Sequence, residues 1–395
     1  MKKRSRKKIW AVAAALALVV AALPFVGIGG DATDVYGSYG IIDDTEVTFA
    51  SETTCTHGTP ASFWSMDGTH HWKMCTTDGC TAVYDHAAHS YTDGVCACGL
   101  HAADGDQPFD HAAAGWTGIS GYQSSLGAGK YYLTGDVMTT GTSLNLSASG
   151  GEIWLCLNGH DIIGCTGFPI LTITSGTIHL CDCAGGGAAY FESPATMSPV
   201  QFGVNATLNM YGGTLGSDTV QSGIGVDFFN SNCTFNMYGG TITNCTDSFW
   251  STGGGGVRVY SNGAFNMLGG EIKNCTAING GGVYVDSDGT FNMYGGVISD
   301  CDATGTSYTD GGGGVYNAGA FTMEGGTITD CDATNGGGVY VDGNVAFNML
   351  GGSISSCNAT EGGGVYVKYD GEFTMTGGVI GGADASDGNY AAGTS

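Results

Sequence analysis

The stretch VYVDSDGTFNMYGGVISDC, residues 283–301, decides the fold of this chain because its pattern returns along the sequence. Five copies place a Phe ten residues before a Cys, and a sixth copy, from Phe373, lacks the Cys. Successive Phe residues lie 30, 26, 30, 26 and 26 residues apart. Repetition at such a period is typical of a solenoid. The six copies begin at Phe235, Phe265, Phe291, Phe321, Phe347 and Phe373.

Each repeat contains three short runs in which apolar and polar residues alternate, as strands require. In the quoted copy the runs start at Val283, Phe291 and Val297, and Gly-rich or Asp-rich corners separate them. Three strands per coil predict an all-β fold, a parallel β-helix solenoid with repeats of about 26–30 residues. We expect the triple-Gly corners to use positive φ angles, which Gly adopts without a steric cost. One coil cannot bury enough apolar surface to stand alone, so stability must come from stacking.

Alternation also predicts which side chains enter the core. One set should point inward and the other outward, because successive side chains of a strand face opposite sides. The predicted inward set is Val283, Val285, Phe291, Met293 and Ile298, and the outward set includes Tyr284 and Asn292.

The runs YYLTGD (131–136) and LNGHDIIG (157–164) resemble the opening coils of pectin-lyase-like bacterial surface proteins, which are often adhesin-like. The resemblance covers roughly residues 130–383. It implies a right-handed parallel β-helix that works in display or adhesion at a cell surface. Pectin-lyase-like folds also include polysaccharide lyases and glycoside hydrolases, so the fold does not decide between binding and catalysis.

The organisation of the chain follows from composition. Six of the eleven basic residues lie within the first eight positions, ahead of an apolar run, so residues 1–32 are predicted to be a secretory signal peptide, with a retained membrane anchor as the alternative. A linker (33–54), a Cys/His-rich module (55–111), the β-helix (112–383) and a tail (384–395) follow. Without the basic head at residues 1–8, five basic residues face 36 acidic ones, a formal charge of −31. We therefore expect a secreted or cell-surface protein that neither binds nucleic acid nor inserts into a membrane.

Residues 55–111 hold seven of the nine histidines and five of the fifteen cysteines. They resemble small Cys/His modules of bacterial surface proteins. A module this small needs a staple, and two cysteine pairs around a short loop supply four zinc ligands. Two structural disulfides are the alternative, because exported proteins form them. The predicted zinc ligands are Cys75, Cys80, Cys96 and Cys98, with His71 and His89 as alternates.

Six cysteines in the repeats are expected to form one vertical file of buried thiols, a structural role, with disulfides between neighbouring coils as the alternative. These residues are Cys181, Cys245, Cys275, Cys301, Cys331 and Cys357.

Exposed aromatic residues are the candidate ligand contacts. Tyrosines recur at one outward position, where they would bind sugar rings or simply stabilise the sheet. Two insertions enlarge one corner of the solenoid, and solenoid binding sites often occupy such loops. The candidate contacts are Tyr284, Tyr340 and Tyr366 in the file and Phe249, Trp250 and Tyr308 in the insertions.

No catalytic motif is evident. The strand positions hold no pair of carboxylates spaced for glycoside hydrolysis, and the Asp286-Ser-Asp288 turn lacks the repeat of calcium-binding β-rolls, so calcium is not expected. We therefore predict a protein for display and recognition whose partners are glycans or surface proteins. A carbohydrate-active enzyme and a passive stalk are the alternatives.

Overall fold

The computed structural model describes residues 111–165, 167–229, 232–247, 253–381 and 388–391. It also describes the backbone of five short strands between residues 65 and 96, which pair antiparallel in two small sheets. The predicted signal peptide and linker lie outside the described residues. The five strands are β1 (Ser65–Met66), β2 (His70–Met74), β3 (Val83–Ala88), β4 (Tyr91–Thr92) and β5 (Val95–Cys96).

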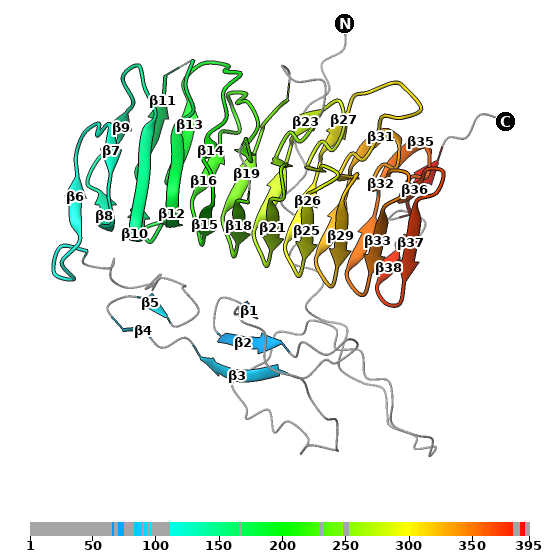
Figure 1. Cartoon of the computed structure of the whole chain (residues 1–395), viewed down its shortest axis with the longest axis horizontal. Coiled ribbons are helices and arrows are strands. Elements are labelled where there is room, and N and C mark those ends of the chain that lie inside the picture. Colours follow the sequence, from blue (N-terminus) through cyan, green and yellow to red (C-terminus); the bar gives the residue numbers. More distant parts are fainter. Residues whose placement is uncertain are drawn as a thin grey trace, which may run out of the picture. The chain divides into compact units, whose positions relative to one another are not determined.

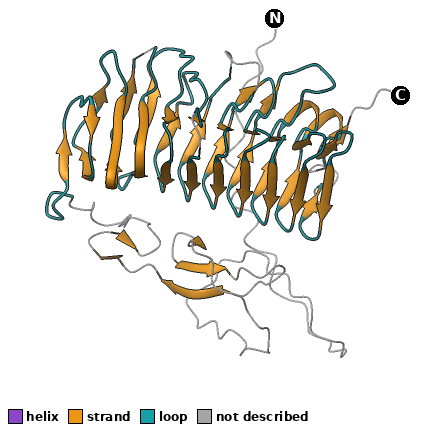
Figure 2. Cartoon of the chain, viewed as in Figure 1, coloured by secondary structure: helices purple, strands orange, loops and turns teal. Residues whose placement is uncertain are grey.

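From residue 117 onward the chain winds into a parallel β-solenoid of about nine turns (Figure 1). Figure 2 shows the described part of the chain as strands joined by loops and turns. This confirms the predicted all-β solenoid. Among the described residues there is no helix with the length and apolar character needed to cross a bilayer.

Three rows of parallel strands run along the solenoid, and each strand pairs with its counterparts in neighbouring coils. Two long strands, β10 (Leu144–Cys156) and β12 (Leu171–Cys181), belong to both the first and the second row. The first row, which carries the Val-Tyr-Val motif, also contains β7 (Ser125–Leu126), β14 (Val200–Phe202), β17 (Val226–Asp227), β20 (Val257–Val259), β24 (Val283–Val285), β28 (Val315–Asn317), β32 (Val339–Val341) and β36 (Val365–Val367).

The second row carries the Phe-Asn-Met motif. Besides β10 and β12 it contains β6 (Thr117–Ile119), β8 (Gly129–Leu133), β15 (Ala206–Met210), β18 (Thr234–Met237), β21 (Ala264–Met267), β25 (Thr290–Met293), β29 (Ala320–Met323), β33 (Ala346–Met349) and β37 (Glu372–Met375).

The third row follows the Gly-Gly corner. It contains β9 (Val137–Met138), β11 (Ile162–Gly164), β13 (Ala188–Phe191), β16 (Thr214–Gly216), β19 (Thr241–Thr243), β22 (Glu271–Lys273), β26 (Val297–Ser299), β30 (Thr327–Thr329), β34 (Ser353–Ser355) and β38 (Val379–Ile380).

The later coils add a fourth row of short strands, beyond the three strands per coil that the sequence predicted. All but the last of these strands directly follow a repeat cysteine. These strands are β23 (Thr276–Ala277), β27 (Asp302–Ala303), β31 (Asp332–Asn335), β35 (Asn358–Glu361) and β39 (Tyr390–Ala391).

The core consists of identical residues stacked in columns. Phe265 pairs in register with Phe291, and Phe291 with Phe321. Centroids of neighbouring Phe rings in this column lie 4.4–5.0 Å apart. The other predicted inward residues are buried as well, among them Met293 and Ile298. The predicted register and the predicted core are therefore confirmed.

Two different constraints require glycine in the triple-Gly corners. The first Gly of a triplet adopts a positive φ, +59° at Gly280, as expected. The third Gly instead lacks room for a side chain, because a Cβ at Gly314 would lie 2.6 Å from Ile328 Cγ2 and 2.7 Å from the Gly338 carbonyl oxygen. The positive-φ interpretation therefore accounts for only part of the motif, and close contact between coils accounts for the rest.

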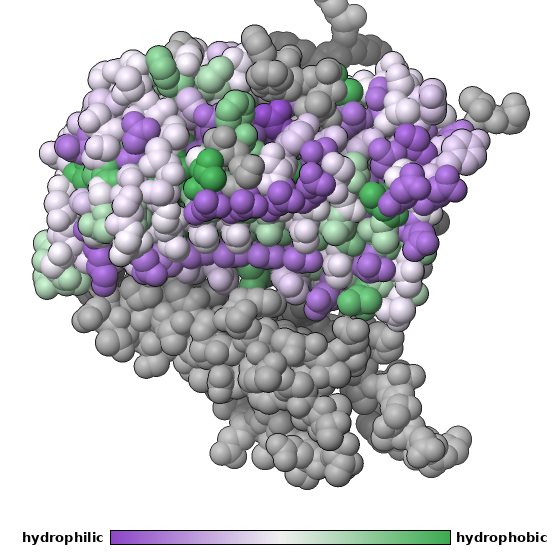
Figure 3. Space-filling view, viewed as in Figure 1, coloured by the Kyte–Doolittle hydropathy of each residue, from purple (hydrophilic) through white to green (hydrophobic). Residues whose placement is uncertain are grey.

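The outer face carries polar ladders. In the second strand row, the side-chain amide of Asn266 donates to Asn236 Oδ1 at 2.8 Å, and the amide of Asn292 donates to Asn266 Oδ1 at 2.9 Å. Such side-chain bonds run from coil to coil in the same direction as the backbone pairing. Figure 3 shows hydrophilic side chains gathered in rows across one face of the solenoid.

Candidate functional site

A shallow polar hollow of about 300 Å³ lies on the outer face of the third strand row. Its side chains project outward because the residues that alternate with them, such as Phe191, Leu215 and Ile242, are buried in the core. The residues that define this polar hollow are Asp161, Tyr190, Thr214, Asp218, Thr241 and Lys273.

One side of the polar hollow is formed by Asp161 and Tyr190. Asp161 Oδ1 accepts a hydrogen bond from the Ala188 backbone N–H at 2.9 Å. Burial raises the pKa of Asp161, and the nearby carboxylates of Asp136 and Asp182 contribute to the increase. Burial and the charge of Asp161 also raise the pKa of Tyr190, so its phenol remains a hydrogen-bond donor at neutral pH.

Asp218 and Lys273 contribute opposite charges to the polar hollow. The Thr243 hydroxyl donates to Asp218 Oδ1 at 2.9 Å, which orients the carboxylate. Lys273 Nζ lies 2.7 Å from Glu271 Oε2, and this pairing raises the pKa of Lys273. The hollow therefore presents hydrogen-bond acceptors and donors within one small area of a regular sheet.

The tyrosines inside the file have both ring faces covered by neighbouring rings. Tyr284 stacks between Tyr260 and Tyr316, with ring centroids 5.7 and 5.1 Å away. Tyr340 is fully buried, so the prediction that it contacts a ligand is wrong. Tyr366 is half-buried and stacks on Tyr340 at 5.3 Å. The file stabilises the sheet, which was the alternative reading of this pattern.

An insertion between two coils also contacts the tyrosine file, at Tyr316. The Tyr316 hydroxyl donates to the Thr309 carbonyl at 3.4 Å and to Asp342 Oδ2 at 3.2 Å. Asn335 of the next coil holds the insertion through a 2.8 Å hydrogen bond to the Asp310 carbonyl. Tyr308, at the tip of this insertion, is 78% exposed and remains a candidate ligand contact. Phe249 and Trp250, predicted as contacts from the other insertion, lie outside the described residues.

Five of the six predicted file cysteines form a buried column of free thiols. Each thiol lies 3.1–3.2 Å from the carbonyl oxygen two residues earlier. Burial raises the pKa of Cys301 well above its usual range, which keeps the thiol protonated and unreactive. The members are Cys245, Cys275, Cys301, Cys331 and Cys357.

Cys181 does not belong to this file. Aligning Cys181 with the repeat Cys places Leu171, ten residues earlier, opposite the repeat Phe, but Leu171 pairs with Val200 of the first strand row. Ile178 pairs with Leu208, which occupies the Phe position. Cys181 is therefore the last residue of the second-row strand β12 and, three positions after the inward Ile178, faces outward. It packs under Trp116 instead of entering the core. The early coil has diverged too far for its residues to be aligned by the Cys alone.

Most of the predicted zinc site falls beyond what the structure describes. Cys75, Cys80, Cys98 and the alternate His89 lie outside the described residues. Cys96 in β5 and the alternate His71 in β2 are described by their backbone alone. Zinc or disulfide bonding in this module therefore stays a prediction.

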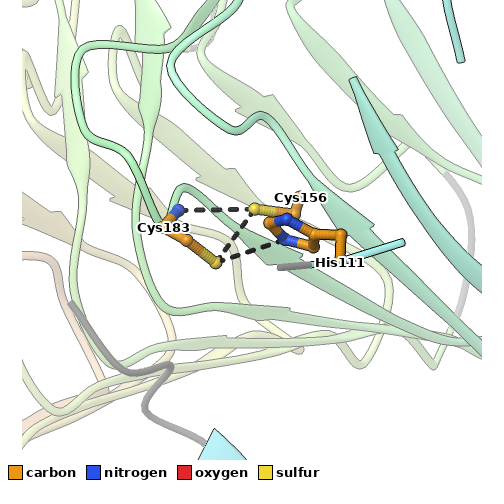
Figure 4. A group of neighbouring side chains, drawn as sticks. All are labelled: His111, Cys156 and Cys183. Atoms are coloured by element: carbon orange, nitrogen blue, oxygen red, sulfur yellow. Dashed lines mark hydrogen bonds between the residues drawn. The ribbon is translucent and has the colours of Figure 1, made fainter. Parts of the chain in front are cut away.

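A different group of side chains, within the described residues, is arranged to hold a metal ion. His111, Cys156 and Cys183 point toward one another, and their donor atoms all lie within 4.8 Å (Figure 4). Cys183 Sγ lies 3.1 Å from Cys156 Sγ and 3.6 Å from His111 Nε2. Cys181 pairs in register with Cys156 and packs in the same buried cluster. These residues could hold a metal, and none of them lines the polar hollow.

Sequence reasoning missed this group because its members are far apart along the chain and follow no metal-binding motif. His111 was assigned to the Cys/His module, whereas Cys156 and Cys183 lie in the solenoid. One signal was present. Cys156 and Cys183 fall outside the repeat position of the other cysteines, so the core column does not account for them.

Comparisons of the chain with protein families, with curated proteins and with solved structures found no match.

Proposed function

We propose that this chain is a secreted or cell-surface display protein that binds neutral glycans in the polar hollow. The observation that carries the proposal is the mixed lining of the hollow. Sugars expose many hydroxyl groups that both donate and accept hydrogen bonds, and their C–H faces pack on aromatic rings. Asp161 and Asp218 supply acceptors, Lys273 supplies a donor, and Tyr190 supplies a donor and a ring.

The charge of the chain selects among glycans. The acidic excess disfavours polyuronates and other anionic polymers, so neutral sugars fit best. The strands also favour recognition, because side chains on regular paired strands are held in fixed positions, and this lowers the entropy lost on binding.

A glycan array probed with the full chain tests the proposal. We expect binding to a neutral glycan that Tyr190→Ala or Asp218→Ala weakens about tenfold or more, equivalent to about 1.4 kcal/mol. Thr327→Ala is the matched control, because Thr327 is an outward residue of the same strand row outside the polar hollow. This variant should bind as the wild type does.

Three outcomes would contradict the proposal. If no glycan binds, the passive-stalk alternative is favoured. If Tyr308→Ala abolishes binding while the hollow variants bind normally, the ligand site lies on the insertion. If a polysaccharide panel releases reducing ends or unsaturated uronates in the presence of the chain, the protein is an enzyme.

A further inference from the structure

The group formed by His111, Cys156 and Cys183 joins two parts of the chain. His111 begins a turn that the Trp116 backbone N–H closes by donating to the His111 carbonyl at 2.9 Å. Cys156 ends the long strand β10, and Cys183 lies just beyond the end of β12. Trp116 packs on this outer surface together with the Cys156 and Cys181 side chains. The turn 111–116 is therefore attached to the outer face of the early coils around these sulfurs.

One of the distances between the donor atoms already matches a tetrahedral zinc ion, and a second needs a small adjustment. Zinc bonds of about 2.3 Å to sulfur and about 2.1 Å to nitrogen place a sulfur and a nitrogen ligand about 3.6 Å apart. Cys183 Sγ and His111 Nε2 lie 3.6 Å apart. Two sulfur ligands should lie about 3.8 Å apart, whereas Cys156 Sγ and Cys183 Sγ lie 3.1 Å apart. Cys183 is half-buried, so a small side-chain rotation can open that distance.

The imidazole of His111 is held in position before any ion binds. Its ring stacks on Tyr132, with centroids 4.7 Å apart and an interplanar angle of 8°. The ring also meets Trp116 edge to face at 5.0 Å. His111 is only 2% exposed, and Cys156 is fully buried. Ligands whose orientation is fixed by their surroundings lose little entropy when the metal binds.

A disulfide bond is the competing explanation for two sulfurs this close. It would need the two sulfurs to approach to about 2.05 Å, and it would involve Cys156 and Cys183 alone. It would not account for the imidazole nitrogen of His111 beside them, or for the Cys181 side chain packed in the same cluster. A buried imidazole among several thiols is the donor set that zinc prefers.

We propose that His111, Cys156 and Cys183 bind a Zn²⁺ ion that clamps the turn 111–116 onto the early coils of the solenoid. Both thiols bind as thiolates, and their protons pass to the solvent as the ion enters. Cys181 offers a further sulfur beside the ion. The site is structural, because the bound ion fixes the segment through which the chain enters the solenoid.

Metal analysis of the full chain tests this site. We expect His111→Phe and Cys183→Ser each to lose one zinc ion per chain relative to the wild type. Phe keeps the aromatic ring between Tyr132 and Trp116 but has no donor nitrogen, so a folded variant is expected. Cys165→Ser is the matched control, because Cys165 is a half-buried thiol of the early coils outside the group. Zinc bound by the Cys/His module cancels in the comparison.

Two further measurements keep the test independent of folding. Cobalt added in place of zinc should give a thiolate charge-transfer band that the Cys165→Ser control retains and Cys183→Ser weakens. A chelator should increase chymotrypsin cleavage at Trp116 about tenfold or more in the wild type, and not at all in His111→Phe. Equal zinc content in the wild type and both ligand variants would overturn the proposal. So would peptide mapping without reduction that recovers Cys156 bonded to Cys183.

Discussion

Replacing Gly314 by Ala should destabilise the solenoid although the change adds a single methyl group. The new Cβ would lie 2.6 Å from Ile328 Cγ2 and 2.7 Å from the Gly338 carbonyl oxygen, far inside normal contact distance. The Ile328 methyl can rotate away, but the carbonyl cannot, because it accepts the Val315 N–H of the coil-to-coil ladder at 2.9 Å. Relief therefore requires neighbouring coils to separate by several tenths of an ångström.

The cost of Gly314→Ala has two parts. Overpacking of a core by one methyl group typically costs about 1–3 kcal/mol. Stretching the ladder hydrogen bond removes part of the roughly 0.5–1.5 kcal/mol that such a bond contributes. We expect the free energy of unfolding to fall by about 1–4 kcal/mol, summing these two contributions. Urea unfolding followed by circular dichroism measures the change.

Gly135→Ala is the control for this prediction. A Cβ at Gly135 would meet no atom within 4 Å, so its effect should stay within about 0.5 kcal/mol. If Gly314→Ala proves as stable as Gly135→Ala, the third glycine of the repeat is not a packing requirement, and the spacing between coils is softer than the structure indicates.

Three other predictions follow from buried groups. Arg258→Met should lower the free energy of unfolding by about 3–5 kcal/mol, because it leaves the buried Asp227 carboxylate without the guanidinium that binds it at 2.9 and 2.8 Å. Adding Asp227→Leu should restore most of that loss in urea unfolding. A double variant no more stable than the single one would refute this. Asp302→Asn should raise the free energy of unfolding by about 0.2–1 kcal/mol at pH 7. Burial and the facing Asp332 raise the pKa of Asp302, and an amide at this position removes the repulsion between the two carboxylates. Protonation of Asp302 removes the same repulsion in the wild type, so the stability advantage of the Asn variant should shrink as the pH falls through the raised pKa of Asp302. An advantage that grows in acid would contradict the raised pKa. In the native protein, maleimide should label half-buried Cys165 but leave Cys301 unlabelled until urea unfolds the chain, and rapid labelling of native Cys301 would show that the thiol column opens.

The architecture could be predicted because each coil repeats the same physical problem. A Phe that returns every 26 or 30 residues fixes the register, and the register then places Met293 and Ile298 in the core without further information. The alternation of side chains within a strand correctly predicted that these residues point into the core. Local pattern and global stacking agree, so the solenoid follows from the sequence.

The sites could not be predicted in the same way, because they depend on what lies beside the strands. Tyr340 alternates as an outward residue, yet a neighbouring insertion and stacked tyrosines bury it completely. The polar hollow combines residues such as Asp161 and Lys273 from different coils. The outward residues of the third strand row differ from coil to coil, so no repeated pattern marks them. The early coils lack the repeat signature, which led to the misplacement of Cys181.

The matched register has a consequence for how such a chain can change its length. Val283 and Val339 are the two neighbours of Val315, and all three make equivalent pairings. Excision of residues 315–338 would bring Gly314 directly before Val339 and would set Phe347 on Phe291 with the contacts that each already makes. Unequal recombination between repeated gene segments can therefore shorten or extend the solenoid by whole coils while its core columns stay in register.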